Sequence, residues 1–184
     1  MSTSGAVATA ADAARIERAR ALVAAVPDPE IPVITLADLG ILRDVRLEEG
    51  RICVVLTPTY VGCPATEAIR EEVLRVLADD GLADARVEVT LSPPWTTDWI
   101  SEAGRERLRA YGIAPPHTMA DGTAAGEAPR EQPIRLVRAQ PAGVACPRCG
   151  SHDTERLAAF GSTPCKALHR CRACREPFDH FKPY

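Results

Sequence analysis

Two pairs of closely spaced cysteines constrain the fold of this 184-residue chain more than any other feature. Cys146 and Cys149 form one CxxC pair, Cys171 and Cys174 form a second, and 21 residues separate the pairs. Two such turns bring four thiolates to one tetrahedral ion, which is typical of a structural zinc site. A segment of about 40 residues buries too little apolar surface to fold unaided, so the metal is expected to stabilise it. We therefore predict a zinc ribbon over residues 144–184.

The same four sulfurs leave an alternative open, because a rubredoxin-like iron site or an iron–sulfur cluster uses the same ligand type. A fifth cysteine in this region, Cys165, is left over, and it is either a spare thiol or a functional one that faces the rest of the protein. His152, His169 and His180 are expected to lie at the surface or to hydrogen-bond to the metal ligands, since four cysteines already satisfy zinc.

Charge separates the C-terminal part from the rest of the chain. Residues 146–184 carry seven basic and four acidic side chains, whereas residues 1–145 carry 15 basic and 21 acidic ones. The net charge of the whole chain, −3, argues against general attraction to nucleic acids or membranes. No apolar run approaches the roughly 20 residues of a membrane span. Seven cysteines without a recognisable secretion signal favour metal or thiol chemistry, so we expect a cytoplasmic protein.

Residues 11–113 show alternating helical and strand patterns. The predicted helices span residues 11–26, 64–80 and 101–110, and the predicted strands span residues 41–47, 51–56 and 87–91. This order, α–β–β–α–β–α, predicts a small α+β domain. The two strands that flank Gly50 are predicted to form a hairpin. Both faces of residues 51–56 are largely apolar, so this strand is predicted to be central, with Cys53 as a packing residue. Residues 1–10 are predicted to be a disordered leader, and residues 114–143, rich in Pro, Gly and Ala, are predicted to be a linker.

The stretch Thr57–Thr66, reading TPTYVGCPAT, carries a second candidate site. It follows an apolar strand and precedes a predicted helix, with Cys63 directly before Pro64. Because proline is favoured at the first helical position, Cys63 is predicted to be the cap residue, among unpaired N–H groups at the positive end of the helix. Thiols in such places are good nucleophiles and metal ligands, but a free cysteine often only packs, and both interpretations stay open.

A proline-rich loop supplies two acidic candidates, Asp28 and Glu30. Pro27, Pro29 and Pro32 exclude a continuing helix here, so the loop is expected to be structured. Acids in such loops are usually turn or cap residues, which is the structural alternative to a role at a site.

Several dispersed motifs resemble known families. The loop DPEIP at residues 28–32, the DLG turn at residues 38–40 and the TPT-x-x-GCP stretch resemble the iron–sulfur assembly domain of SufT-like proteins. Adding PPWTTDWI, RERLRAYGIAPP, FGSTPCKA, RCRACREPFDHFK and the two-part layout, the chain resembles the PaaD family, small accessory subunits encoded with the phenylacetyl-CoA ring-1,2-epoxidase. The resemblance covers roughly residues 22–113 and 145–182.

This resemblance implies a non-catalytic role in aerobic phenylacetate catabolism, as a factor that helps mature the metal centres of the oxygenase. The expected client is the reductase component, which carries a [2Fe–2S] cluster. The resemblance also implies that Cys63 handles iron or a cluster, with Asp28 and Glu30 close to it. Our hypothesis is a transient site at Cys63, with Cys165 as a second candidate thiol and a homodimer as a way to offer two thiolates. Three side chains are expected to donate hydrogen bonds to sulfur: Thr57, Thr59 and Thr66.

Three other classes of function compete with this hypothesis. An enzyme with Cys63 as nucleophile needs a base, and the one histidine in residues 1–145 is His117, in the predicted linker. A zinc ribbon that binds nucleic acid would carry a denser basic stripe and more stacking aromatic residues. A non-catalytic scaffold that holds the oxygenase subunits together is the strongest alternative. It predicts stable co-purification with the complex and no bound iron.

Overall fold

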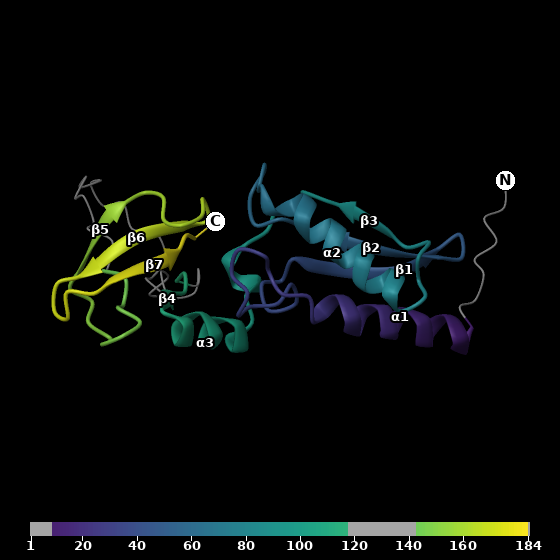
Figure 1. Ribbon diagram of the computed structural model, residues 1–184, viewed down its shortest axis with the longest axis horizontal. Coiled ribbons are helices and arrows are strands. Elements are labelled where there is room, and N and C mark those ends of the chain that lie inside the picture. The colour runs from purple at the N-terminus through teal and green to yellow at the C-terminus, as the bar shows by residue number, and fades with distance from the viewer. Residues whose placement is uncertain (1–8, 118–142, 184) are drawn as a thin grey trace, which may run out of the picture. The chain divides into compact units, whose positions relative to one another are not determined.

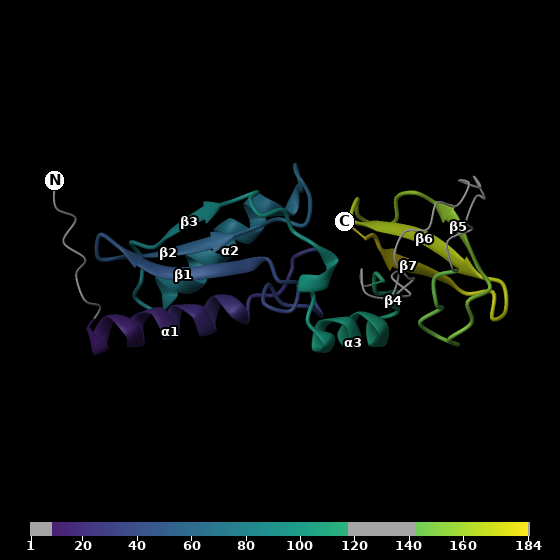
Figure 2. The same ribbon diagram turned by 180° about the vertical axis from the view of Figure 1, so that it is seen from behind.

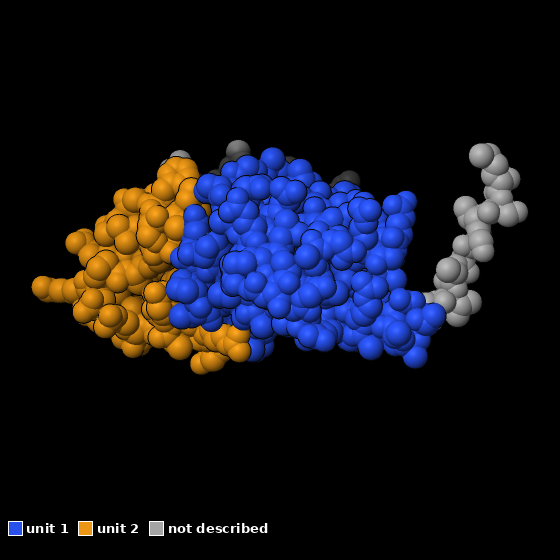
Figure 3. Space-filling model, turned by 45° about the vertical axis from the view of Figure 1, so that its right-hand side comes forward, with its two compact units in different colours: residues 1–95, 99–104 blue, residues 96–98, 105–184 orange. Residues whose placement is uncertain are grey.

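The computed structural model describes residues 9–117 and 143–183, arranged as two compact units. The first unit comprises residues 1–95 and 99–104, and the second comprises residues 96–98 and 105–184 (Figure 3). Most of the predicted leader and linker lies outside the described residues. Thr9 and Ala10 do not belong to a leader, because Thr9 caps the first helix in a reciprocal pair of hydrogen bonds with Asp12.

The elements are labelled in Figure 1. In chain order they are α1 (Ala10–Ala24), β1 (Leu42–Glu48), β2 (Arg51–Leu56), α2 (Ala65–Asp79), β3 (Arg86–Val89), the 3-10 turn η1 (Thr97–Trp99), α3 (Glu102–Tyr111), β4 (Ile113–Ala114), β5 (Thr154–Ala158), β6 (Lys166–Cys171) and β7 (Pro177–Phe181). The predicted α+β class and the predicted order of the first six helices and strands are confirmed, with element ends shifted by one or two residues. None of the helices in the described ranges is both long and apolar enough to cross a membrane.

The first unit is built on a three-stranded sheet in the order β1-β2-β3. β1 and β2 form the predicted hairpin, and the turn between them uses positive φ at Glu49 and Gly50. β3 pairs parallel to β2, which is therefore the central strand, as its apolar sequence predicts. α1 packs on β1 and on α2, and α2 also contacts β3, so both helices cover the sheet (Figure 1).

The second unit contains a four-stranded sheet in the order β4-β7-β6-β5. β5, β6 and β7 pair antiparallel, and the short strand β4 adds parallel to β7. A small core forms between them from Ala114, Cys146, Cys171 and Phe178. The C-terminal ribbon predicted from the cysteine spacing is therefore present. Its edge strand β4 consists of Ile113, the last residue of the predicted first domain, and Ala114, the first residue of the predicted linker.

The division between the units differs from the predicted domain end at Ile113. It falls within α3, between Gly104 and Arg105. Arg105 is buried, and its guanidinium donates hydrogen bonds to the carbonyl oxygens of Thr97 (2.6 Å) and Pro116 (2.7 Å). These contacts tie η1, α3 and the segment after β4 together. The sequence shows Arg105 only as one more charge on a polar helix, so this tertiary role was not predictable from the pattern.

Candidate metal centre and thiol site

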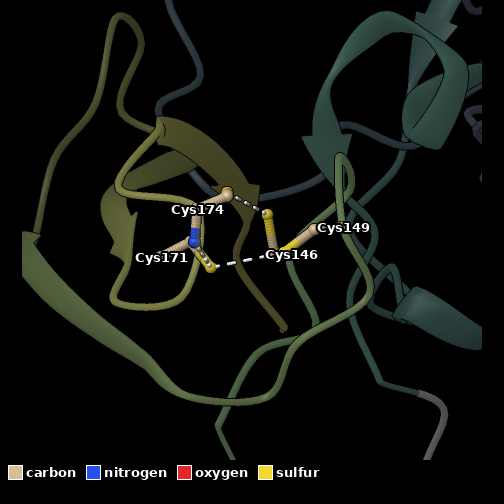
Figure 4. A group of neighbouring side chains, drawn as sticks. All are labelled: Cys146, Cys149, Cys171 and Cys174. Atoms are coloured by element: carbon tan, nitrogen blue, oxygen red, sulfur yellow. Dashed lines mark hydrogen bonds between the residues drawn. The ribbon is translucent and has the colours of Figure 1, made fainter.

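The sulfurs of the two CxxC pairs gather between two turns of the second unit (Figure 4). All four Sγ atoms lie within 4.8 Å of one another. The sulfur–sulfur distance is 3.8 Å for Cys146 and Cys174, and 3.5 Å for Cys149 and Cys171. A tetrahedral ion bound to thiolates at about 2.3 Å requires sulfur–sulfur separations of roughly 3.8 Å. The four sulfurs therefore fit a zinc ion.

The backbone of each turn prepares the sulfurs for metal. The turn that carries Cys146 ends at Gly150, and the turn that carries Cys171 ends at Arg175, both with positive φ. The N–H of Cys174 points at the sulfur of Cys171, 3.5 Å away, and this contact lowers the pKa of the Cys171 thiol to about 7. A lower thiol pKa favours the thiolate of Cys171, which is the form that binds metal. The pKa values of the Cys149 and Cys174 thiols are raised, with the neighbouring sulfurs among the causes, so this effect is confined to Cys171.

Three loops of the first unit meet at one end of its sheet (Figure 1, Figure 2). The N–H of Thr57, directly after β2, donates to the carbonyl of Ile41, directly before β1 (2.9 Å). The N–H of Thr90, directly after β3, donates to the carbonyl of Leu56 (2.9 Å). The loop that follows α1, the TPTYVGCPAT loop and the segment after β3 therefore share the end of the sheet at which β2 and β3 finish. Asp28, Glu30 and Cys63 all belong to these loops.

The predicted role of Cys63 as helix cap is wrong. α2 begins at Ala65, and its cap residue is Pro64, which makes no side-chain capping hydrogen bond. Gly62, with φ of 83°, bends the chain so that the N–H of Cys63 donates to the carbonyl of Tyr60 (3.4 Å). Cys63 thus lies one residue before the cap, with a half-buried side chain.

Two of the three predicted threonines are buried in this region, Thr57 and Thr59, while Thr66 is half-buried in the first turn of α2. The Oγ1 atom of Thr57 has no hydrogen-bond partner among the described residues. A buried polar group without a partner costs about 1–3 kcal/mol, so such an atom needs an explanation.

Asp28 is a turn residue that accepts hydrogen bonds from the backbone of its own loop. Its side chain is buried, and Oδ1 accepts hydrogen bonds from the N–H groups of Glu30 and Ile31, both at 2.8 Å. Asp28 therefore shapes the loop, whereas Glu30 is half-buried on the same turn. Cys165 belongs to the second unit, where it is buried with its sulfur 3.0 Å from Thr163 Oγ1.

Comparison with known proteins gives the family. Residues 16–91 match the family described as iron–sulfur cluster assembly protein, and residues 130–182 match the PaaD zinc beta ribbon domain. The chain is 45% identical over 163 residues to an Escherichia coli (strain K12) protein that is provisionally named as a subunit of 1,2-phenylacetyl-CoA epoxidase. That match covers 88% of this chain and 89% of the relative. The chain belongs to the PaaD family.

Other relatives match one part of this PaaD-family chain. The iron–sulfur protein maturation auxiliary factor SufT of Staphylococcus aureus (strain USA300) is 37% identical over 83 residues, which is 44% of this chain and 93% of that protein. The solved structure of a domain of unknown function, DUF59, from Bacillus anthracis is 28% identical. The alignment covers 53% of this chain and 94% of the Bacillus anthracis chain, with a TM-score of 0.49. The PaaD ribbon match begins at residue 130, inside the predicted linker.

A second cluster in this PaaD-family protein resembles a metal site only by composition. Glu48, Cys53 and Glu88 place ligand-type atoms within 4.8 Å of one another. Arg46 pairs with Glu48 (2.5 Å) and with Glu88 (2.6 Å), and Arg86 also pairs with Glu48. Burial raises the pKa of the Cys53 thiol, which keeps it protonated. Arginines already neutralise these carboxylates, so Cys53 remains the packing residue that its central strand predicts.

The histidines are not part of the four-cysteine group, but two of the three do not lie at the surface. His152 is exposed, whereas His169 and His180 are buried in β6 and β7. They lie next to each other, with ring centroids 5.2 Å apart. A signal for this was present, because His169 alternates with Ala167 and Cys171, which are also buried, along β6. The four cysteines explain the metal site without the histidines, but they do not decide which face of a strand a histidine occupies.

Proposed function

We propose that this protein is an accessory maturation factor for a phenylacetyl-CoA epoxidase, and that it assists insertion of iron or an iron–sulfur cluster into the reductase component through Cys63. Two relatives support the proposal, one for the enzyme system and one for the maturation role. The Escherichia coli relative carries the name of an epoxidase component, and the Staphylococcus aureus relative carries the name of an iron–sulfur maturation factor.

The observation that carries the proposal is that one loop contains both a partly exposed thiol, Cys63, and a hydroxyl without a hydrogen-bond partner among the described residues, Thr57. Cys63 is half-buried, and Thr57, six residues earlier, has a buried hydroxyl without a partner among the described residues. Sulfur ligands of iron are stabilised by hydrogen-bond donors around them. A site that is completed only when cargo arrives explains why this hydroxyl is left unpaired in the free protein.

A carrier must also release its cargo. One cysteine in the loop holds iron less firmly than a complete ligand set, and a homodimer would bring two such thiolates together. Asp28 keeps the neighbouring loop in shape through its hydrogen bonds to Glu30 and Ile31. The ribbon, with seven basic and four acidic side chains in residues 146–184, would dock on an acidic face of the client.

The test is metal analysis after anaerobic reconstitution with iron and sulfide. We expect about one zinc per chain in the wild type and in Cys63→Ser, because the four cysteines of the two CxxC pairs bind one ion. Iron and acid-labile sulfide are expected in the wild type and are expected to be lost in Cys63→Ser. Cys165→Ser is the matched control, because it removes a buried thiol of the second unit, and its iron content shows whether Cys165 takes part.

The same variants are then assayed for cluster transfer to the apo reductase. Cys63→Ser is expected to abolish maturation while zinc content stays unchanged. If the reductase acquires its cluster at the normal rate with Cys63→Ser, the carrier role is wrong. Zinc without iron in every variant, together with stable co-purification with the epoxidase, would favour the non-catalytic scaffold instead.

A further inference from the structure

A cavity of about 560 Å³ lies in the second unit beside β6 and β7. Its volume falls within the range of roughly 300–1,000 Å³ that is usual for small-molecule sites. Three histidines and two permanently basic side chains line it: His117, His169, His180, Arg156 and Lys182. Among the described residues that line this cavity there is no carboxylate.

Two buried imidazole side chains, His169 and His180, line this cavity. His169 is 8% exposed and His180 is 7% exposed. His169 Nδ1 and His180 Nε2 have no hydrogen-bond partner in the part of the chain that the structure describes. Leaving such groups unpaired costs free energy, so their presence points to a ligand that pairs with them.

Arg156 and Lys182, the two basic side chains at the cavity, also have no acidic partner among the described residues. Arg170 and Arg172 share Glu155, whereas Arg156 forms no ion pair with any described residue. The ammonium group of Lys182 lies 4.4 Å from the centre of the Phe160 ring and donates a hydrogen bond to the carbonyl oxygen of Ala159 (3.5 Å). The described residues that line the cavity include no acid, and a guanidinium in such surroundings favours a carboxylate or a phosphate, which it binds through two parallel hydrogen bonds.

The same surroundings argue against a metal cation. The three histidines do not form a group whose ring nitrogens all lie within 4.8 Å of one another, in contrast to the four sulfurs of the ribbon. Nearby positive charges without a carboxylate would also repel a divalent ion. An anion meets neither obstacle.

We propose that this cavity binds a small organic anion whose carboxylate or phosphate head pairs with Arg156 and accepts hydrogen bonds from His169 and His180. A neutral imidazole carries its proton on either nitrogen, so each ring can donate from the atom that is now unpaired. The apolar body of the ligand lies against Val144 and Ala167. This site goes beyond the proposed function and does not depend on the thiol loop of the first unit.

The experiment is isothermal titration of the zinc-loaded full-length protein with three ring compounds: phenylacetate, phenyl phosphate and benzyl alcohol. At least one anion is expected to bind with one-to-one stoichiometry, and comparison of the two anions identifies the preferred head. Benzyl alcohol, which has the same ring without the charge, is expected to bind at least about tenfold more weakly, because a hydrogen bond between charged groups is worth about 1.5–3 kcal/mol.

Variants then locate the site. Arg156→Gln is expected to weaken anion binding at least about tenfold, by the same reasoning. Arg172→Gln is the matched control, because Arg172 pairs with Glu155 and does not line the cavity, and its affinity should stay at the wild-type value. Zinc content is measured for each variant as a check on folding.

Three results would overturn the proposal. They are the absence of binding by both anions, equal affinity for benzyl alcohol and the anions, or unchanged affinity in Arg156→Gln. The comparison of charged and uncharged compounds uses the wild-type protein. It therefore tests whether the cavity prefers an anion even if a variant fails to retain zinc.

Discussion

Thr57 lies where an apolar side chain would stabilise the fold more than a hydroxyl does. It follows β2, the most buried strand of the first unit, and only 1% of its surface is exposed. Valine has nearly the same shape as threonine and leaves no polar atom unpaired. We therefore expect the hydroxyl of Thr57 to donate a hydrogen bond to a group that binds later. We expect that group to be a sulfur atom of the transient site at Cys63.

Thr57→Val is expected to raise the free energy of unfolding of the first unit by about 1 kcal/mol, since it removes an unpaired buried hydroxyl. The same change should lower the iron and sulfide retained after reconstitution. Urea denaturation and metal analysis measure the two effects. Thr35→Val is the matched control, because Thr35 Oγ1 donates to Asp38 (3.0 Å) and its loss should destabilise. Equal destabilisation by both changes would contradict our interpretation of Thr57.

His180 gives the second unit a dependence on pH. Burial, together with the neighbouring rings of His169 and His117, lowers the pKa of the His180 imidazole to about 4. The unfolded chain binds this proton with a pKa near 6.5, so it holds more protons than the folded chain between those values. Stability is therefore fully present above about pH 6.5 and falls as the pH drops toward 4.

Between pH 7 and pH 5 this effect amounts to about 2 kcal/mol for the wild type, and we expect His180→Phe to remove it. The measurement is urea denaturation at both pH values, with zinc content followed in parallel. His152→Gln is the control, since His152 is exposed and should keep the wild-type dependence. Identical pH dependence in His180→Phe and the wild type would contradict the prediction.

At the scale of elements, the metal site and the ribbon sheet are one structure. Cys171 is the last residue of β6, and the turn that carries Cys174 leads into β7. Cys146 belongs to the small core of this sheet. The strands of the second unit therefore cannot keep their pairing once the two turns separate.

Cys171→Ser is expected to lose zinc and to unfold the second-unit sheet, because structural zinc contributes about 10–16 kcal/mol in small zinc domains. The first unit, which has its own sheet and helices, should stay folded. Zinc analysis and amide hydrogen exchange measure the two parts separately. Cys165→Ser should keep both its zinc and the protection of the second-unit amides from hydrogen exchange. Protected amides in β6 and β7 after complete zinc removal would show that the prediction is wrong.

Local patterns predicted much of these elements, and long-range contacts account for what they missed. The hairpin at Gly50 and the grouping of four cysteines, Cys146, Cys149, Cys171 and Cys174, follow from spacing within short stretches, so the sequence was sufficient for them. The cap position of Cys63 failed, because the bend at Gly62 moves the start of α2 by one residue. The place of Arg105 and the pairing of β4 depend on partners far along the chain, which periodicity does not record.

At the scale of the whole molecule, each chain has one half-buried loop cysteine, Cys63, and we expect it to hold the cargo. A single thiolate is a weak anchor for an iron–sulfur cluster, which usually has four cysteine ligands. Two chains that share one cluster would contribute a thiolate each. The loaded and empty forms of the protein are therefore expected to differ in mass.

Anaerobically reconstituted wild type is expected to be a dimer in light scattering, and the iron-free protein a monomer. Cys63→Ser should remain monomeric after the same reconstitution, with its zinc in place. Removal of the cluster by oxidation should return the wild type to the monomer. The same mass for loaded and empty wild type would exclude a cluster shared between two chains.

The parallel pairing of β4 with β7 has a consequence for anyone who moves this ribbon into another protein. Ile113 and Ala114 cover the outer edge of β7, and they precede the first zinc ligand by more than 30 residues. A fusion that starts at residue 130 or 144 would leave that edge open, and open strand edges invite association with other chains. The transferable unit begins near Arg105, where α3 enters the second unit and its buried guanidinium anchors the chain on either side.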